Sequence, residues 1–193
     1  LHYAARKFFK PILVSIRDLD DVVDVYVVND QHQGLEAEMK VELFHFNGDK
    51  LFTDSSQIKV KPFSSTIFNS FDRVVMLDGN DSSSLMLRAE LLSNGEILGR
   101  SHQFFKRPKE LSIPVPDFEY GIEFVDGKYM ITIRSNSFLC QLHLISSKVR
   151  GVFSDNYFDM LPNEVVMIDF EPEENKELKE SDLKIRTLHE MMN

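Results

Sequence analysis

Residues 37–44 follow a strict period of two, and this pattern constrains the fold more than any other part of the chain. One set of positions is apolar and the set between them is mainly charged, as the residues show in order: Ala37, Glu38, Met39, Lys40, Val41, Glu42, Leu43 and Phe44. Successive side chains of a strand point to opposite faces of a sheet. The pattern therefore predicts a strand with an apolar face turned inward and a charged face turned outward. The same period recurs over 12–17 and 23–28, with a turn at Asp20 and Asp21 between them.

Short strands separated by turn signals continue through the first half of the chain. Hairpin turns are predicted at 46–50 and 93–96, each of which contains an Asn-Gly pair. Further strands are expected at 58–61, 74–77, 85–92 and 97–105, with a polar loop at 78–82. This amounts to about seven strands in about 105 residues, a spacing that is typical of a β-sandwich.

A proline-rich stretch at 106–116 interrupts this series. Pro108, Pro114 and Pro116 favour an extended connector. A second series follows it, with strands expected at 118–125, 129–134, 138–145, 152–153, 165–170 and 183–188. We therefore predict an all-β chain of two sandwiches in tandem, with residues 1–107 forming the first, 108–116 a linker and 117–193 a second, smaller one. Residues 1–9 are expected to form a short helical or irregular segment before the first strand.

Charge, hydropathy and cysteine content exclude several classes of partner and site. The formal net charge is −9, which argues against nucleic acid, because nucleic acid binding needs a basic face. No apolar run approaches the roughly 20 residues of a membrane helix, so we expect no membrane insertion. Cys140 is the single cysteine, which excludes an intrachain disulfide, and we expect a buried, inert thiol. Because the chain begins at Leu1 and not at Met, we expect it to be part of a longer polypeptide.

The stretch 154–164 has the composition of a corner at the end of a strand. Its leading residues have side chains that bond to nearby backbone N–H groups, and Asn156 tolerates a left-handed conformation. One of the two aromatic residues that follow is expected to turn inward, and Pro162 to end the segment. The motif residues to which we assign this structural role are Ser154, Asp155, Asn156, Tyr157, Phe158, Asp159 and Pro162.

This stretch resembles the last immunoglobulin-like domain of β-mannosidases, which are multidomain glycoside hydrolases of the clan that also contains β-galactosidases and β-glucuronidases. Residues 1–15, which read Leu-His-Tyr-Ala-Ala-Arg-Lys-Phe-Phe-Lys-Pro-Ile-Leu-Val-Ser, resemble the point where those enzymes leave the catalytic barrel. The two motifs flank nearly the whole chain in the expected order. The resemblance implies that both sandwiches are immunoglobulin-like and that a catalytic barrel precedes them in the same polypeptide.

The resemblance also implies the chemistry of the parent enzyme. Such an enzyme would remove terminal β-D-mannose from oligosaccharides by a retaining mechanism with two carboxylates, and its location would be periplasmic, secreted or lysosomal. Both carboxylates would lie in the barrel, so the present chain would be structural and would have no catalytic residue. Two alternatives stay open: the same architecture from an exo-glycosidase of another sugar, and a free-standing module that binds carbohydrate or protein. A homo-oligomer also stays open.

Residue types that carry chemistry are present but lack the spacing of a site. Asp155 and Asp159 read as a turn-capping residue and a solvated residue, and the six histidines lack the spacing of metal ligands. The loop at 78–81 lacks the later Glu of a calcium loop. We therefore expect no catalytic residue, no cofactor and no metal ligand in this chain. Tyr120 and Tyr157 are the candidates for the edge of a sugar pocket, although the absence of Trp and the excess of Phe over Tyr favour core packing.

Overall fold

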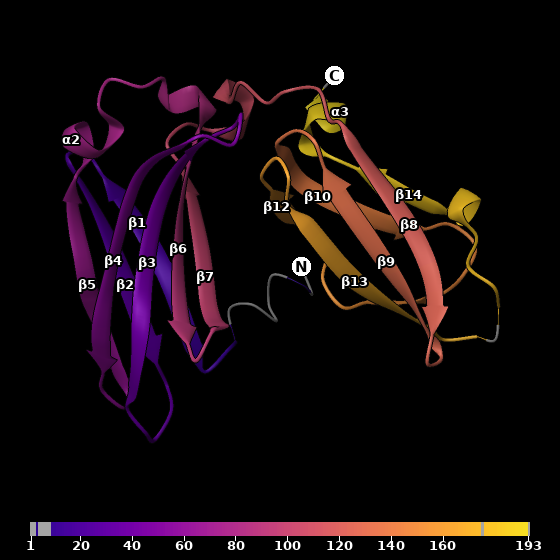
Figure 1. Cartoon of the computed structure of the whole chain (residues 1–193), viewed down its shortest axis with the longest axis horizontal. Helices are drawn as coiled ribbons and strands as arrows, with labels where there is room; N and C mark the ends of the chain where they lie inside the picture. The colour runs from indigo at the N-terminus through magenta and orange to yellow at the C-terminus, as the bar shows by residue number, and fades with distance from the viewer. Residues whose placement is uncertain (1–2, 4–8, 175, 193) are drawn as a thin grey trace. The chain divides into compact units, whose positions relative to one another are not determined.

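The computed structural model describes residue 3, residues 9–174 and residues 176–192 (Figure 1). It divides into two compact units. The first comprises Leu1–His45 and Asp49–Ser112, and the second comprises Phe46–Gly48 and Ile113–Asn193. Both units consist mainly of antiparallel strands, which confirms the prediction of an all-β chain with two sandwiches. The segment 1–9, for which we expected helical or irregular structure, lies almost entirely outside the described residues.

The first unit is a sandwich of two antiparallel sheets. One sheet has the strand order β1-β2-β5 and the other has the order β4-β3-β6-β7. The strands are β1 (Ile12–Leu19), β2 (Val22–Asn29), β3 (Leu35–His45), β4 (Lys50–Val60), β5 (Ser64–Asp72), β6 (Leu85–Ser93) and β7 (Glu96–Phe104). The β3–β4 and β6–β7 hairpins lie where the Asn-Gly pairs predicted them. Asn94 and Gly95 both have positive φ, at 51° and 82°, as the tight turn between β6 and β7 requires.

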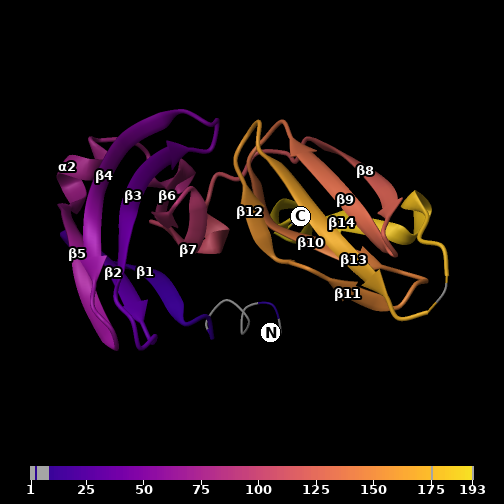
Figure 2. The same cartoon turned by 60° about the horizontal axis from the view of Figure 1, so that its bottom comes forward.

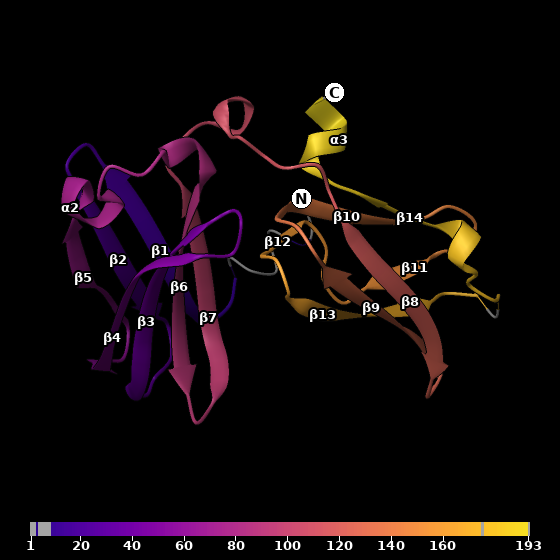
Figure 3. The same ribbon diagram turned by 45° about the horizontal axis from the view of Figure 1, so that its top comes forward.

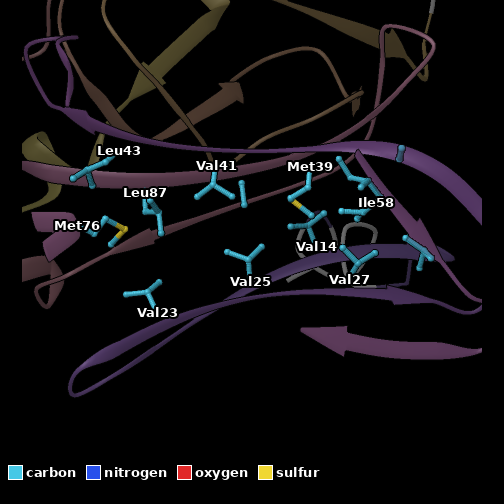
Figure 4. Packing of buried hydrophobic residues seen from close by; sticks show 14 of the residues in the cluster. Val14, Val23, Val25, Val27, Met39, Val41, Leu43, Ile58, Met76 and Leu87 are labelled. Carbon is cyan, nitrogen blue, oxygen red and sulfur yellow. The ribbon is translucent and has the colours of Figure 1, made fainter. Parts of the chain in front are cut away.

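The apolar positions of the alternating pattern form the core between these sheets (Figure 4). Met39, Val41 and Leu43 of β3 are fully buried, and they lie on the side that faces Val25 and Val27 of β2. The charged position Glu42 faces the other way, as predicted, but it is also buried. Its carboxylate forms ion pairs with Lys40 and Lys50, which compensate for the removal of the charge from water.

The segment 74–77 is a helix and not the expected strand. Helix α2 (Arg73–Leu77) begins after Asp72, whose carboxylate accepts a hydrogen bond from the Val75 N–H at 2.9 Å. This N-cap stabilises the first turn and outweighs the strand preference of two adjacent valines. The helix leaves Val74 and Val75 exposed and buries Met76 and Leu77. The strand β5 before it was not predicted, because its sequence is mostly polar and lacks regular alternation.

The second unit is a smaller sandwich of a four-stranded and a three-stranded sheet. The orders are β11-β13-β9-β8 and β12-β10-β14. The strands are β8 (Phe118–Val125), β9 (Lys128–Ser135), β10 (Leu139–Ser146), β11 (Gly151–Phe153), β12 (Phe158–Met160), β13 (Val165–Pro172) and β14 (Leu183–Arg186). Figure 2 shows β8 and β11 at opposite edges of the four-stranded sheet. In Figure 3 the short helix α3 (Leu188–Met192) follows β14.

Candidate functional site

The corner at 154–164 is tied to β10 by the side chain of Asn156. The Asn156 Oδ1 accepts a hydrogen bond from the Leu144 N–H at 2.8 Å, and its Nδ2 donates to the Leu144 carbonyl at 2.9 Å. Asn156 is only 3% exposed. A carboxamide carries the same donor and acceptor as a peptide group, so this side chain continues the pairing that β12 makes with β10 at Leu142 and Leu139.

The two residues before Asn156 also bond to backbone. The Asp155 Oδ1 accepts a hydrogen bond from the Asn156 N–H at 2.8 Å. Ser154 pairs with Asp169 of β13: its N–H donates to the Asp169 carbonyl at 2.7 Å, and its Oγ accepts from the Asp169 N–H at 3.0 Å. These contacts connect the corner to the four-stranded sheet, as Asn156 connects it to the three-stranded sheet.

Near the start of the corner Tyr157, at φ 60°, takes the left-handed conformation, and not Asn156, which was expected to tolerate it. The Tyr157 N–H donates to the Leu142 carbonyl at 2.9 Å. The left-handed conformation costs a residue with a Cβ about 1 kcal/mol or more, and this hydrogen bond offsets the cost. Tyr157 is 47% exposed, whereas Phe158 is half-buried, so Phe158 is the aromatic residue that turns toward the protein.

The Tyr157 ring stacks on His143 of β10. Their ring centroids lie 4.2 Å apart, and the Tyr157 hydroxyl lies 2.8 Å from the His143 Nε2. Partial burial lowers the pKa of His143, and the positive charge of Arg186 lowers it further. Arg186 lies directly across from His143 in the β10–β14 pairing. The imidazole therefore favours its neutral form, which can either donate to or accept from the tyrosine hydroxyl.

Asp159 supports a bulge in β10. Its Oδ1 accepts a hydrogen bond from the Gln141 N–H at 2.7 Å, and Gln141 has φ 49°. The bulge interrupts the alternation of β10, so Leu139 is buried in addition to Cys140 and Leu142. Burial raises the pKa of the Cys140 thiol, and the neighbouring Asp159 carboxylate raises it further. Cys140 is buried, as predicted, and the raised pKa favours the neutral thiol.

The corner ends in a turn at 161–164. The Glu164 carboxylate accepts a hydrogen bond from the Leu161 N–H at 2.8 Å, and Asn163 takes a left-handed φ of 68°. Pro162 lies between Leu161 and Asn163, two positions after Met160, the last residue of β12. The seven motif residues therefore lie close together along one corner. The carboxylates of Asp155 and Asp159 are both bonded to backbone N–H groups, an arrangement that stabilises a loop and leaves them poorly placed to serve as a catalytic pair.

A pocket of about 370 Å³ lies elsewhere in the second unit, and the sequence reasoning did not predict it. It is lined by Ile122, Phe124, Tyr129, Glu177, Leu178 and Glu180. Neither Tyr120 nor Tyr157, which we expected at a pocket edge, is among these residues. The available signal was the apolar row Tyr120, Ile122 and Phe124 at alternate positions of β8. Within the described residues, no group of three or more His, Cys, Asp or Glu could hold a metal ion, and no helix is long and apolar enough to cross a membrane.

Comparison with family models decides the identity of the two sandwiches. Residues 21–110 match the model of a mannosidase Ig/CBM-like domain, and residues 113–191 match the model of an Ig-fold domain. The chain is a mannosidase Ig/CBM-like domain followed by an Ig-fold domain. The resemblance to the C-terminal domains of β-mannosidase-like glycoside hydrolases is therefore confirmed. The corner and the pocket both lie in the Ig-fold domain, and residues 1–15 begin before either matched range.

Two solved structures have the same fold as this pair of domains. The β-D-mannosidase of Dictyoglomus thermophilum matches 96% of the chain with a TM-score of 0.80 and 21% identity. The exo-chitosanase CsxA of Amycolatopsis orientalis matches 97% of the chain with a TM-score of 0.66 and 12% identity. The chain spans 22% and 26% of the lengths of these two proteins. A comparison with curated protein sequences gave no match.

Proposed function

We propose that this chain is the structural C-terminal part of an exo-glycosidase that releases terminal β-D-mannose from oligosaccharides. The match of residues 21–110 to a mannosidase domain model is the observation that carries the proposal. The two-carboxylate chemistry would lie in an upstream catalytic barrel of the same polypeptide, and the two sandwiches would pack against that barrel. The domain boundaries predicted above, with a linker at 108–116, are part of this proposal.

The geometry of the corner supports a structural role. A retaining glycosidase needs two carboxyl groups that face the substrate about 5–5.5 Å apart. Asp155 and Asp159 instead accept hydrogen bonds from the backbone of 156 and 141. Each carboxylate thus stabilises the local backbone, as expected if the catalytic residues lie in another part of the polypeptide.

A second candidate keeps the architecture and changes the sugar. It is favoured by the likeness to the exo-chitosanase, which covers nearly the whole chain at a TM-score of 0.66. In both proposed enzymes the upstream barrel would select the sugar. The two sandwiches would therefore have the same structural role in either enzyme.

The experiment compares the 193-residue chain with the proposed longer polypeptide that contains the upstream barrel. Both are assayed for release of nitrophenol from a β-mannoside and from a β-glucosaminide. We expect no turnover by the chain and turnover of the mannoside by the longer protein. Faster turnover of the glucosaminide would replace the first candidate with the second. Turnover by the isolated chain that survives repurification would contradict the structural role.

A further inference from the structure

The pocket lies beside β8, an edge strand of the four-stranded sheet of the Ig-fold domain. The sheet that contains β8 has four strands, and the sheet that faces it has three. In the register of the β8–β9 pair, Tyr120 lies opposite Ile133, Ile122 opposite Ile131 and Phe124 opposite Tyr129. Residues directly opposite each other in an antiparallel pair share a face. The row on β8 therefore points to the interior side of its sheet.

Exposure changes sharply between these two neighbouring strands. Ile131 and Ile133 on β9 are fully buried, whereas Tyr120 is 36% exposed and Phe124 is 63% exposed. The difference is what one missing strand in the facing sheet would produce, since β8 is the edge strand. The interior face of β8 is thus an apolar surface that the domain's own strands do not cover.

The loop before β14 closes this surface on one side and makes it a pocket. Leu178 is buried and anchors the loop, and the Tyr129 hydroxyl donates to the Lys176 carbonyl at 3.4 Å. Glu177 and Glu180 line the pocket together with Phe124. At about 370 Å³ the space is at the lower end of the range of about 300–1,000 Å³ for small-molecule sites, a size that suits one sugar ring better than a long chain.

The lining defines the chemistry of a ligand. An aromatic ring presents a negatively charged face, which attracts polarised C–H groups. The Phe124 ring lies against Tyr129 at 4.8 Å between centroids, so its position is held while much of it stays in solvent. Ionised carboxylates only accept hydrogen bonds. The fitting ligand is therefore a compact ring with an apolar face and several hydrogen-bond donors.

We propose that this pocket binds one saccharide ring, with its C–H face on Phe124 and its hydrogen-bond donors on Glu177 and Glu180. Several kinds of compact ring carry many hydrogen-bond donors, and the choice of a sugar among them rests on the proposed function of the chain. The donors can be the hydroxyl groups of a neutral sugar or the ammonium group of an amino sugar. Hydroxyl and ammonium groups can both donate to the carboxylates of Glu177 and Glu180, and the experiment below distinguishes the two kinds of sugar.

The test is titration of the isotopically labelled chain with mannose and with glucosamine, monitored through backbone amide NMR shifts. A single ring in a half-open site is expected to bind with a Kd of about 1–10 mM. The affected amides should be those of 121–125 and of Leu178. A mannose derivative with every hydroxyl methylated keeps the apolar ring but has no donors, and it should not bind.

Variants assign the binding to the pocket. Phe124→Ala should weaken binding about tenfold, because it removes the stacking surface. Phe63→Ala is the matched control, since Phe63 is 61% exposed in the other unit. Glu180→Gln should weaken the binding of glucosamine more than the binding of mannose, because it removes the negative charge that attracts the ammonium group. Its control is Glu123→Gln, on the opposite face of β8 from Phe124.

Binding of either sugar or of both supports the proposal: binding of mannose identifies hydroxyl donors, and binding of glucosamine alone identifies the ammonium group. The proposal would be overturned if neither sugar changed the amide NMR shifts at concentrations up to about 100 mM, roughly ten times the weakest expected Kd. Shifts that survive Phe124→Ala unchanged would overturn it as well. The assay involves no hydrolysis, so a negative result leaves the outcome of the nitrophenyl glycoside assay untouched.

Discussion

Asn156 and Leu144 form a reciprocal pair in which one side chain satisfies both backbone groups of a buried strand residue. The two residues are 12 positions apart in the chain, and the contact fixes the corner against β10. Asn156→Ala would leave the Leu144 N–H and carbonyl without these partners. We expect the free energy of unfolding of the Ig-fold domain to fall by about 3 kcal/mol, because buried unpaired groups cost about 1–3 kcal/mol each.

Chemical denaturation of Asn156→Asp sharpens that prediction. Aspartate keeps an acceptor for the Leu144 N–H but places a second oxygen against the Leu144 carbonyl. It should therefore destabilise the domain although its size is nearly unchanged. Asn136→Ala serves as the control, because the Asn136 side chain is exposed and its change should cost less than about 0.5 kcal/mol. Equal stability of the 156 and 136 variants would contradict the role of the pair.

Asp155→Ala removes the carboxylate that accepts from the Asn156 N–H at 2.8 Å. The loss of one local hydrogen bond should cost about 1 kcal/mol, which lowers the Tm of a domain of this size by about 4–8 °C. Asp155→Asn retains an acceptor and should recover part of the loss. In the longer polypeptide proposed above, turnover of the folded protein should be nearly unchanged. A collapse of the rate at unchanged Tm would instead make Asp155 a substrate-contacting residue.

The titration of His143 should be shifted by its surroundings. Its pKa is lowered by partial burial and by the charge of Arg186, so NMR titration should place it below the ordinary value of about 6.5. Arg186→Gln should raise the pKa toward that value, whereas Lys184→Gln on the same strand should change it less.

The sign of the pH dependence follows from this shift. The unfolded chain binds a proton at His143 more readily than the folded chain does. The contribution of His143 to stability is therefore fully present above about pH 6.5 and is lost as the pH falls toward the folded pKa. A pKa at or above 6.5 in the folded chain would contradict the prediction.

Two glycines of the Ig-fold domain should respond to alanine in opposite ways. A Cβ at Gly151 would meet the Glu171 carbonyl oxygen and, at 2.5 Å, the Phe170 ring. A Cβ at Gly121 of β8 would meet nothing within 4 Å. We expect Gly151→Ala to destabilise the domain by about 2 kcal/mol through overpacking, and Gly121→Ala to stabilise it by about 0.5 kcal/mol through reduced chain entropy. Urea unfolding of both variants checks this, and equal responses would contradict the packing at Gly151.

Local periodicity predicted most strands and the hairpin turns of this chain, because period and turn chemistry depend on neighbours in the sequence, but it did not predict β5 or β12. Met39, Val41 and Leu43 are buried as their alternation predicts. The segment 74–77 was mistaken for a strand because a single cap at Asp72 outweighed the β preference of two valines.

The details of the corner and the pocket depend on contacts between distant segments, so the sequence alone did not reveal them. Tyr157 and not Asn156 is left-handed, and the Asn156 side chain bonds to Leu144, which is 12 positions away in the chain. The pocket joins the β8–β9 hairpin to Glu177 and Glu180, which are 42 and 45 positions beyond its last residue, Ser135. Nothing local indicates that these residues meet.

The uncovered strand β8 also bears on the solubility of the domain. An edge strand with an apolar face is a template on which another copy can add, the first step of aggregation. The outward positions of β8 include Glu119 and Glu123, and the exposed Glu119 carboxylate lies 3.2 Å from Arg134. Stacking identical copies along this edge would bring like carboxylates together. The same strand that leaves the pocket open therefore carries charges that oppose self-assembly.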